Sequence, residues 1–284
     1  MKMNNHLLDQ QIRVWLDEDI GFGDVTTLAT VPENVDGKGI LYVKESGVIA
    51  GLEVAERVFS TLDPTLHYHQ KASDGEYLEK GTVIAEVEGK VQSILTGERL
   101  ALNLLQHLSG IATMTHRFVE EARKGSEKVR VVDTRKTTPG LRMLEKYAVV
   151  VGGGHNHRLG LFDAVLIKDN HIKGAGGIQQ AILQSRANVP HTTKIEVEVE
   201  SLEQLEEALA VKPDIIMLDN MDVTTMEEAV GRVNGAAIIE ASGGVNLQTI
   251  ASIARTGVDI ISVGSLTHSV TALDISLDLN QRKR

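Results

Sequence analysis

Residues 236–265, AAIIEASGGVNLQTIASIARTGVDIISVGS, contain two apolar runs with a helical pattern between them. The runs AAIIEA and DIISVG are short and rich in isoleucine, as buried strands are. A strand, a helix and a second strand in this order form a unit in which the two strands lie parallel. The stretch therefore predicts a parallel sheet with helices between its strands.

The same alternation begins at about residue 129, and the predicted strands are VRVVD, DAVLIK, KIEVEV, DIIMLD, AAIIEA and DIISVG. So many consecutive units are typical of a barrel or of an open doubly wound sheet. Glycine-rich turns at 242–244 and 264–265 follow the last two strands. One such turn is well explained by tight chain reversal, but two at matching positions favour a barrel that binds phosphate through backbone N–H groups.

The first part of the chain has a different rhythm. Residues 7–18 and 52–61 have helical periodicity, and short strands flank the turn at 46–47. Residues 66–98 read as a series of strands and turns, which predicts a small antiparallel sheet backed by helices. The segment 98–122 has long helical periodicity and is predicted to link this domain to the next.

The composition is that of an ordinary globular enzyme. The 284 residues are 42% hydrophobic and 24% charged, so the chain can bury one large core, or one core and a smaller companion domain. There is no cysteine, which excludes disulfides, thiolate zinc sites and cysteine nucleophiles. No secretory signal is recognisable, and no run reaches the about 18 apolar residues of a membrane-spanning helix. We therefore expect a cytoplasmic protein.

Positive charge is concentrated in residues 133–171, although the formal net charge of the chain is -10. This contrast predicts a cationic pocket for a small, multiply charged anion, and it argues against nucleic acid or a membrane as partner. Arg142 and Lys146 are four residues apart in a helical stretch and are expected to be solvated. The cations and histidines of the segment are Arg135, Lys136, Arg142, Lys146, Arg158, Lys168, His155, His157 and His171.

Polar side chains end most of the predicted strands, where a barrel carries its ligand. Alternation places the three glutamates of KIEVEVE on one face, which requires water, cations, sugar hydroxyls or Mg²⁺ beside them. Glu198 and Asp219 could accept hydrogen bonds from vicinal hydroxyls. Structural salt bridges from such acids to Lys168 or Lys194 explain the pattern equally well, and both interpretations stay open. The strand-end residues are Asp133, Lys168, Glu198, Asp219 and Glu240.

Two loops and one strand end carry the remaining candidates. Arg135 and Lys136 lie among threonines, and arginine offers a planar fork to a carboxylate or phosphate whereas lysine acts as a point charge. The loop 152–158, GGGHNHR, contains an HxH pattern that does not match known zinc patterns, so no metal site is predicted. Lys168 could be a Schiff-base nucleophile or an anion ligand, and the surrounding cations favour the second role.

Residues 133–172, DTRKTTPGLRMLEKYAVVVGGGHNHRLGLFDAVLIKDNHI, closely resemble the quinolinate phosphoribosyltransferases, also called nicotinate-nucleotide pyrophosphorylases. The segments GERLALNLLQHLSGIAT, IEVEVES, IMLDNM, EASGGV and ISVGSLTHS are similar to that family in the same order, so the resemblance covers nearly the whole chain. It implies transfer of phosphoribose from phosphoribosyl pyrophosphate (PRPP) to the nitrogen of quinolinate. Carbon dioxide and pyrophosphate would leave, giving nicotinate mononucleotide in de novo NAD biosynthesis.

The resemblance also implies an architecture. An N-terminal open α/β sandwich would cover residues 1–110, with the segment of about 268–284 packed on it, and an incomplete (β/α) barrel would cover 111–267. Mg²⁺ would be required together with PRPP. The family resemblance further implies a homodimer, or a higher homo-oligomer, in which each sandwich covers the partner's barrel mouth.

For the acceptor, the resemblance assigns residues by motif. Arg135, His157 and Arg158 resemble the ligands of the quinolinate carboxylates. Arg99 would join them from the other subunit. Lys44 falls in a region where the family places a basic residue, and no role is carried over to it.

For the donor, the resemblance assigns a second set. Lys136 and Lys168 resemble the lysines near the transferring centre and the pyrophosphate. Glu198 and Asp219 resemble the acceptors of the ribose hydroxyls. The loops for the 5′-phosphate, with one further phosphate-side contact, would be formed by Ser242, Gly243, Gly244, Gly264, Ser265 and His268.

Three other functions compete with this one. A barrel lyase or aldolase would form a Schiff base at Lys168. A metabolite sensor on the same barrel would bind PRPP but release no pyrophosphate when quinolinate is added. A relative of the same fold adapted to another acceptor is the third, although the set of Arg99, Arg135 and Arg158 suits a dicarboxylate.

Overall fold

The computed structural model describes residues 4–281, and the chain divides into two compact units. The first comprises residues up to 114, residues 143–153 and the segment from 269 onward, and the second comprises 115–142 and 154–268. The chain therefore leaves the first unit and returns to it twice. Among the described residues, no helix is both long and apolar enough to cross a membrane.

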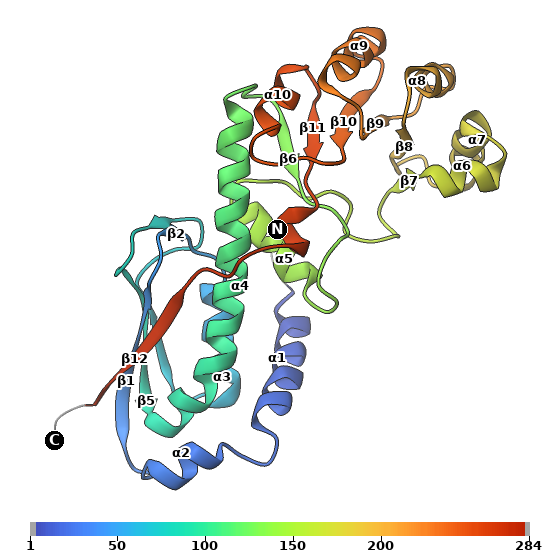
Figure 1. Ribbon diagram of the computed structural model, residues 1–284. Coiled ribbons are helices and arrows are strands. Elements are labelled where there is room, and N and C mark those ends of the chain that lie inside the picture. The colour runs from blue at the N-terminus through green and yellow to red at the C-terminus, as the bar shows by residue number, and fades with distance from the viewer. Residues whose placement is uncertain (1–3, 282–284) are drawn as a thin grey trace. The chain divides into compact units, whose positions relative to one another are not determined.

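The first unit contains a four-stranded antiparallel sheet with the order β12-β1-β5-β3. β1 (Asp36–Val43) and β5 (Val83–Lys90) form its centre, and β12 (Ile275–Gln281) and β3 (His67–Gln70) form its edges. Burial alternates along β1, so one face of the sheet packs on the core. The last strand of the chain thus pairs with the first, as Figure 1 shows.

Helices from the N-terminal third belong to the same unit. They are α1 (Asn5–Ile20), α2 (Val25–Thr30) and α3 (Leu52–Leu62). The short strands β2 (Gly47–Val48) and β4 (Tyr77–Leu78) pair with each other. The antiparallel sheet with helices confirms the α/β fold predicted for the N-terminal part of the chain.

The long helix α4 (Val91–Arg123) begins earlier than the sequence predicts. Residues 90–98 were assigned to a strand and a turn, and this is wrong. Val91 and Ile94 are buried at helical spacing, with 1% and 0% of their surface exposed. Gly97 lies so close to the Phe59 ring that an added Cβ would be 3.1 Å from it. Glycine is needed here for close packing of helices, which a local pattern cannot distinguish from a turn.

Helix α5 (Arg142–Val151) carries a second correction. Lys146, expected to be solvated, is fully buried with 0% of its surface exposed. Its neighbour Glu145 is also buried, and His107 Nε2 lies 2.9 Å from the Glu145 carboxylate. The helix is packed into a core, where charged groups must find partners, and spacing along the sequence does not reveal such packing. Arg142, which starts the helix, is only half-buried.

The second unit contains a six-stranded parallel sheet with the order β6-β11-β10-β9-β8-β7. The edge strands β6 and β7 do not pair with each other in the described part of the chain, so the barrel is incomplete, as predicted. The strands are β6 (Arg130–Val132), β7 (Val165–Ile167), β8 (Ile195–Val199), β9 (Ile215–Asp219), β10 (Ile238–Ser242) and β11 (Ile260–Ser262).

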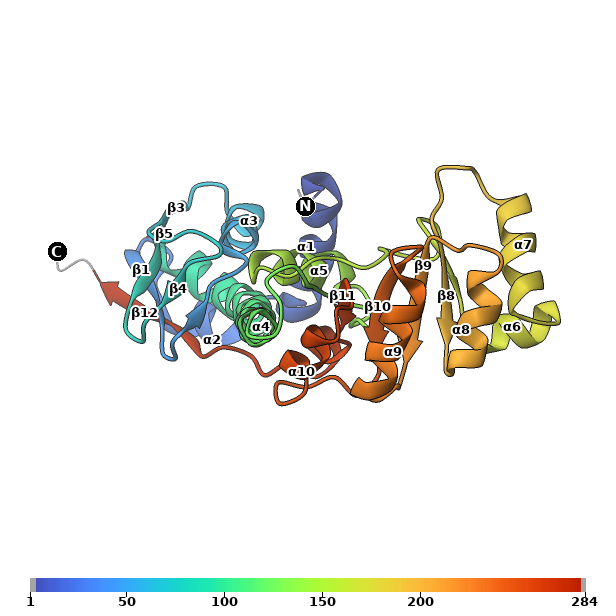
Figure 2. The ribbon, with the colours of Figure 1, turned by 90° about the horizontal axis from the view of Figure 1, so that it is seen from above.

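Helices connect these strands, and α8 and α9 run alongside them in Figure 2. Because all six strands are parallel, their carboxyl ends meet at one edge of the sheet. The register places Met217 opposite both Glu198 and Glu240, and Asp219 opposite Ser242. The helices are α6 (Asp169–Ala175), α7 (Ile178–Asn188), α8 (Leu202–Leu209), α9 (Val223–Val233), α10 (Ile250–Arg255) and α11 (Ser265–His268).

Candidate active site

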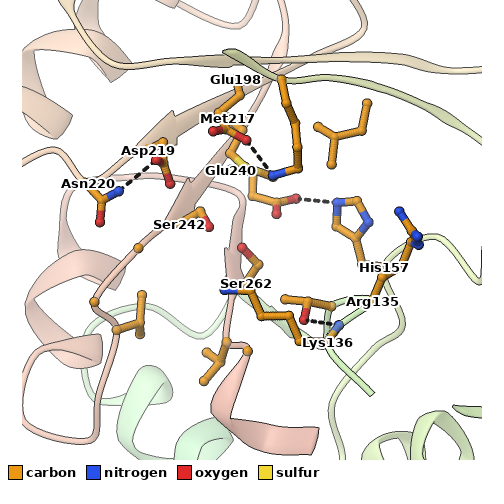
Figure 3. A pocket seen from close by; sticks show the side chains of 18 of the residues that line it. Arg135, Lys136, His157, Glu198, Met217, Asp219, Asn220, Glu240, Ser242 and Ser262 are labelled. Atoms are coloured by element: carbon orange, nitrogen blue, oxygen red, sulfur yellow. Dashed lines mark hydrogen bonds and ion pairs between the residues drawn. The ribbon is translucent and has the colours of Figure 1, made fainter. Parts of the chain in front are cut away.

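A cavity of about 730 Å³ lies at the carboxyl ends of the parallel strands, within the second unit. This volume suits a small-molecule site. Alternate residues of a strand face the same side, and the lining accordingly includes Met217 and Asp219 of β9 and Glu240 and Ser242 of β10. Figure 3 shows these side chains converging. The lining contains the predicted residues Arg135, Lys136, His157, Arg158, Lys168, Glu198, Asp219, Ser242, Gly243, Gly244, Gly264, Ser265 and His268.

Arg135 and Arg158 reach the cavity from two loops. The Nε atom of each is buried and has no hydrogen-bond partner among the described residues. Arg158 Nη1 donates to the Ala164 carbonyl at 3.1 Å, which fixes the side chain. Burial and the charge of Arg135 lower the pKa of Arg158. Two guanidinium groups that repel each other and keep unused donors form a site for an anion with several acceptor oxygens.

Lys168 and Glu198 form an ion pair across β7 and β8. Lys168 Nζ lies 2.7 Å from Glu198 Oε2, and the Glu198 side chain is only 11% exposed. Lys194, the other lysine considered from the sequence, pairs with Asp214 at 2.6 Å. A lysine amine that is held against a carboxylate suits an anion ligand better than a Schiff-base nucleophile.

Lys136 and His268 approach each other over Gly264. A Cβ at Gly264 would lie 3.3 Å from the Lys136 side chain and 3.3 Å from the His268 ring. Thr267 Oγ1 donates to the Lys136 carbonyl at 2.7 Å, which ties the loop after β6 to helix α11. This arrangement places two potential cations beside the last glycine turn.

The turn after β10 is held against the end of β9. The backbone N–H of Asn220 donates to the Ser242 carbonyl at 2.9 Å, and its side-chain amide donates to Asp219 at 2.7 Å. Gly243 has φ of +93°, and a Cβ there would lie 2.2 Å from Asn220 Oδ1. Gly244 has φ of +61° and nothing within 4 Å of a Cβ position. Only glycine fits Gly243, and the turn keeps its backbone accessible from the cavity.

Gly243→Ala is expected to lower the free energy of unfolding by about 1–3 kcal/mol, because the new Cβ is strained by backbone conformation and by contact with Asn220. Urea unfolding followed by circular dichroism measures this change. Gly231→Ala is the matched control, since Gly231 lies in α9 and nothing is within 4 Å of its Cβ position. Equal destabilisation of both variants would contradict the prediction.

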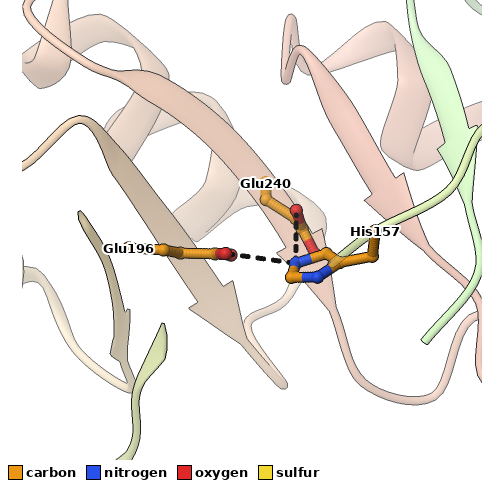
Figure 4. Close-up of side chains that lie close together, drawn as sticks. All are labelled: His157, Glu196 and Glu240. Atoms are coloured by element: carbon orange, nitrogen blue, oxygen red, sulfur yellow. Dashed lines mark ion pairs between the residues drawn. The ribbon is translucent and has the colours of Figure 1, made fainter. Parts of the chain in front are cut away.

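A trio of one histidine and two buried glutamates meets at the cavity: His157, Glu196 and Glu240. His157 Nε2 is 3.1 Å from Glu196 Oε2 and 3.5 Å from Glu240 Oε2, as Figure 4 shows. Glu196 is 3% exposed and Glu240 is 1% exposed. The sequence indicates that Glu196 faces inward and that Glu240 ends a strand. It does not indicate that they meet, because β9 lies between β8 and β10.

The carboxylates of Glu196 and Glu240 influence where the His157 ring carries its proton. Burial opposes a charged ring and lowers the pKa of His157, whereas the hydrogen bonds that the ring donates to Glu196 and Glu240 raise it above the ordinary value. Burial also raises the pKa of Glu196. The backbone N–H of Arg158 donates to His157 Nδ1 at 2.8 Å, so Nδ1 carries no proton. The ring proton that faces the two carboxylates is therefore on Nε2.

The same tautomer bears on metal binding. Ligand atoms of the trio lie within 4.8 Å of one another, which is metal-site spacing. A metal at Nε2 would require that nitrogen to be free of its proton. Because Nδ1 already accepts a hydrogen bond, the proton has no other ring position, and the arrangement favours a hydrogen-bonded trio over a metal site.

Arg99 belongs to the first unit and does not line this cavity. Its side chain is 59% exposed, and its Nη2 lies 3.9 Å from Glu98 Oε1, which is a long ion pair. Lys44 is in the first unit too and lies 3.5 Å from Asp274. An exposed arginine with a weak partner leaves its guanidinium available to another molecule.

The fold and the cavity define an α/β-barrel protein that binds anions at the carboxyl ends of its strands. Comparison with known families is more specific. Residues 111–278 match the C-terminal domain of the quinolinate phosphoribosyl transferase family. Residues 24–109 match the N-terminal domain of the same family. The chain belongs to the quinolinate phosphoribosyltransferase family.

Individual relatives agree with this membership. A probable nicotinate-nucleotide pyrophosphorylase (carboxylating) of Synechocystis is 47% identical over 276 residues, covering 96% of this chain and 92% of the relative. A quinolinate phosphoribosyltransferase (decarboxylating) of Nicotiana tabacum is 44% identical and covers 95% and 81%. The crystal structure of NadC from Streptococcus pyogenes is similar with a TM-score of 0.95 and 44% identity, covering 100% of both chains.

Proposed function

We propose that the chain transfers phosphoribose from PRPP to the ring nitrogen of quinolinate, with release of pyrophosphate and carbon dioxide. The product is nicotinate mononucleotide, formed in de novo NAD biosynthesis. Family membership supports this reaction. The observation in the site that carries it is the pair of arginines with buried, unused Nε donors, Arg135 and Arg158, because a pyridine dicarboxylate supplies the acceptor oxygens that they lack.

The acceptor is held by its two carboxylates. Arg135 and Arg158 bind them as planar forks, and His157 forms the adjoining wall of the pocket. Binding of the dianion removes the repulsion between the two guanidinium groups. Loss of this repulsion favours binding of the acceptor. The bound acceptor is held with its ring nitrogen oriented toward the donor.

The donor occupies the other half of the cavity. Glu198 and Asp219 accept hydrogen bonds from the ribose hydroxyls, and the glycine turns after β10 and β11 bind the 5′-phosphate through backbone N–H groups. Lys136 and Lys168 lie beside the pyrophosphate, with His268 as a further contact. When the pyrophosphate arrives, Lys168 can contact both its present partner Glu198 and the phosphate oxygens.

Bond exchange at the anomeric carbon then follows. The bond from C1′ to the pyrophosphate oxygen breaks, and the lone pair of the quinolinate nitrogen forms the new bond to C1′. The carboxylates of Glu198 and Asp219 stabilise positive charge that develops on the ribose, as carboxylates do at an oxocarbenium-like centre. Lys136 and Lys168 stabilise the charge of the leaving pyrophosphate.

Decarboxylation follows from the first product. The pyridinium nitrogen withdraws electrons, so the pair of the bond between C2 and its carboxylate stays on C2 when carbon dioxide leaves. A proton then replaces the carboxylate at C2. No redox partner is needed, since the pyridinium ring itself is the electron acceptor.

Mg²⁺ would enter with PRPP, bound by the oxygens of the pyrophosphate, where it offsets the charge of the leaving group. The chain suits a metal carried by its substrate, because the cluster with metal-ligand spacing among the described residues keeps its ring proton on Nε2. Each active site would be completed by Arg99 of the partner subunit in a homodimer or higher homo-oligomer. A cytoplasmic location stays a prediction.

The function is tested by an assay of nicotinate mononucleotide made from quinolinate and PRPP. The purified chain is expected to form this product and pyrophosphate in equal amounts, and to form much less product from nicotinate, which lacks the second carboxylate. Chelation of Mg²⁺ with EDTA is expected to stop turnover, and added MgCl2 to restore it. Product from nicotinate at an equal rate, or none from quinolinate, would contradict the proposal.

A further inference from the structure

Two acidic side chains at the cavity have no role in the proposed reaction. They are Glu196 on β8 and Glu240 on β10. Both are almost completely buried, and each has one oxygen, Oε1, without a hydrogen-bond partner among the described residues. Burying two carboxylates is costly, so their retention at this place calls for a reason.

Their shared partner is the His157 ring. Nε2 lies 3.1 Å from Glu196 and 3.5 Å from Glu240, so the carboxylates hold the ring from β8 and β10 together. The opposite ring nitrogen, Nδ1, accepts the backbone N–H of Arg158 at 2.8 Å. The ring thus connects two buried strands to the backbone of the arginine that lines the acceptor pocket.

The loop that carries these residues is fixed from a second side. Asp133, which is 0% exposed, accepts the His157 N–H at 2.9 Å and the Asn156 side-chain amide at 2.7 Å. His155 pairs with Val132 of β6 through an isolated parallel bridge. Asp133 therefore sets the path of the backbone, whereas the ring of His157 is oriented by the carboxylate pair.

We propose that Glu196 and Glu240 are positioning residues for the acceptor site: they fix the tautomer and orientation of the His157 ring and, through Nδ1, the backbone of Arg158. The proposal rests on the proposed function, because the pocket that they position is the one for quinolinate. A ring with its proton held on Nε2 keeps Nδ1 as an acceptor, which is the state that the Arg158 N–H requires. A misplaced Arg158 loses the alignment of its fork with a carboxylate.

Isosteric substitutions test the proposal. Glu196→Gln, Glu240→Gln and the double variant are expected to raise the KM for quinolinate by roughly ten- to a hundredfold, while the KM for PRPP stays within about twofold of its original value. Glu200→Gln is the matched control, since Glu200 comes directly after the strand that carries Glu196 but is exposed. Near-native circular dichroism in each variant excludes a general loss of folding.

The ring itself gives a readout that does not depend on turnover. In the ¹⁵N-histidine spectrum, the His157 signal, assigned by its loss in His157→Gln, is expected to show a protonated Nε2 and an unprotonated Nδ1 at neutral pH. The double variant is expected to lose this fixed state and to titrate near the ordinary histidine pKa of about 6.5. His157→Gln should also raise the KM for quinolinate while leaving both acids in place.

Two results would overturn the proposal. One is a quinolinate KM in the double variant equal to that of Glu200→Gln. The other is a His157 ring with both nitrogens protonated in the wild type, because Nδ1 could not then accept the Arg158 N–H. A wrong proposed function would give another result, because the wild-type chain would then form no nicotinate mononucleotide. The ¹⁵N spectrum would still show whether the two carboxylates fix the protonation of the His157 ring.

Discussion

Arg158→Ala is expected to lower kcat/KM for quinolinate by about a thousandfold, because truncation of one member of a buried ionic contact costs about 2–5 kcal/mol. Arg135→Ala should have a similar effect. The Nε donors of both residues are buried and without partners in the described part of the chain, so an incoming carboxylate gains bonds that no protein group now makes. Steady-state kinetics with quinolinate varied at saturating PRPP measure the effect.

Two comparisons make this result specific. Arg158→Lys keeps the charge but loses the planar fork, so most of the loss should remain. Lys173→Ala removes the same charge from a side chain that is 73% exposed. This variant should leave the kinetics unchanged. If Arg135→Ala and Arg158→Ala both kept the original KM and kcat, the acceptor pocket would have to lie elsewhere.

Mixing two inactive variants, Arg99→Ala and Lys168→Ala, is expected to restore about one quarter of the activity after subunit exchange. In a hybrid dimer, one barrel has its own Lys168 and receives an intact Arg99 from the partner subunit. The second site carries both substitutions and stays inactive. Random exchange makes half of the dimers hybrid, each with one working site, and the nicotinate mononucleotide assay before and after exchange measures the recovery.

A matched pair of variants shows whether the recovery reflects a shared site. Lys136→Ala and Lys168→Ala both alter the lining of the same cavity, so a hybrid of these two contains no intact site and should stay inactive. Exchange is verified by mass spectrometry of differently labelled subunits. Verified hybrids of Arg99→Ala and Lys168→Ala without activity would show that Arg99 does not act across subunits.

Much of the site could be predicted because the second unit obeys simple rules. In a parallel sheet, strand ends and alternate residues converge on one edge, so Lys168, Glu198 and Asp219 could be assigned to one cavity from the sequence. The two glycine turns were recognisable for the same reason. Residue spacing along the chain and position at the strand ends carry this information directly.

The features that escaped prediction depend on contacts between distant segments. Lys146 has the spacing of a surface charge, yet its helix is packed into a core. Gly97 looks like a turn residue, yet it permits close approach to Phe59. The meeting of Glu196 with Glu240 depends on an intervening strand and on a loop that carries a histidine between them. None of these neighbours is near in sequence.

The pairing of β12 with β1 has a consequence for biosynthesis. One side of β1 hydrogen-bonds to residues 275–281, which are translated after the whole second unit. While the ribosome is still making the second unit, the first therefore has an open strand edge, and such edges are sites of aggregation. The antiparallel sheet is completed only after the second unit has been translated. Protection by chaperones during synthesis therefore concerns a strand edge that lies far from its partner in sequence.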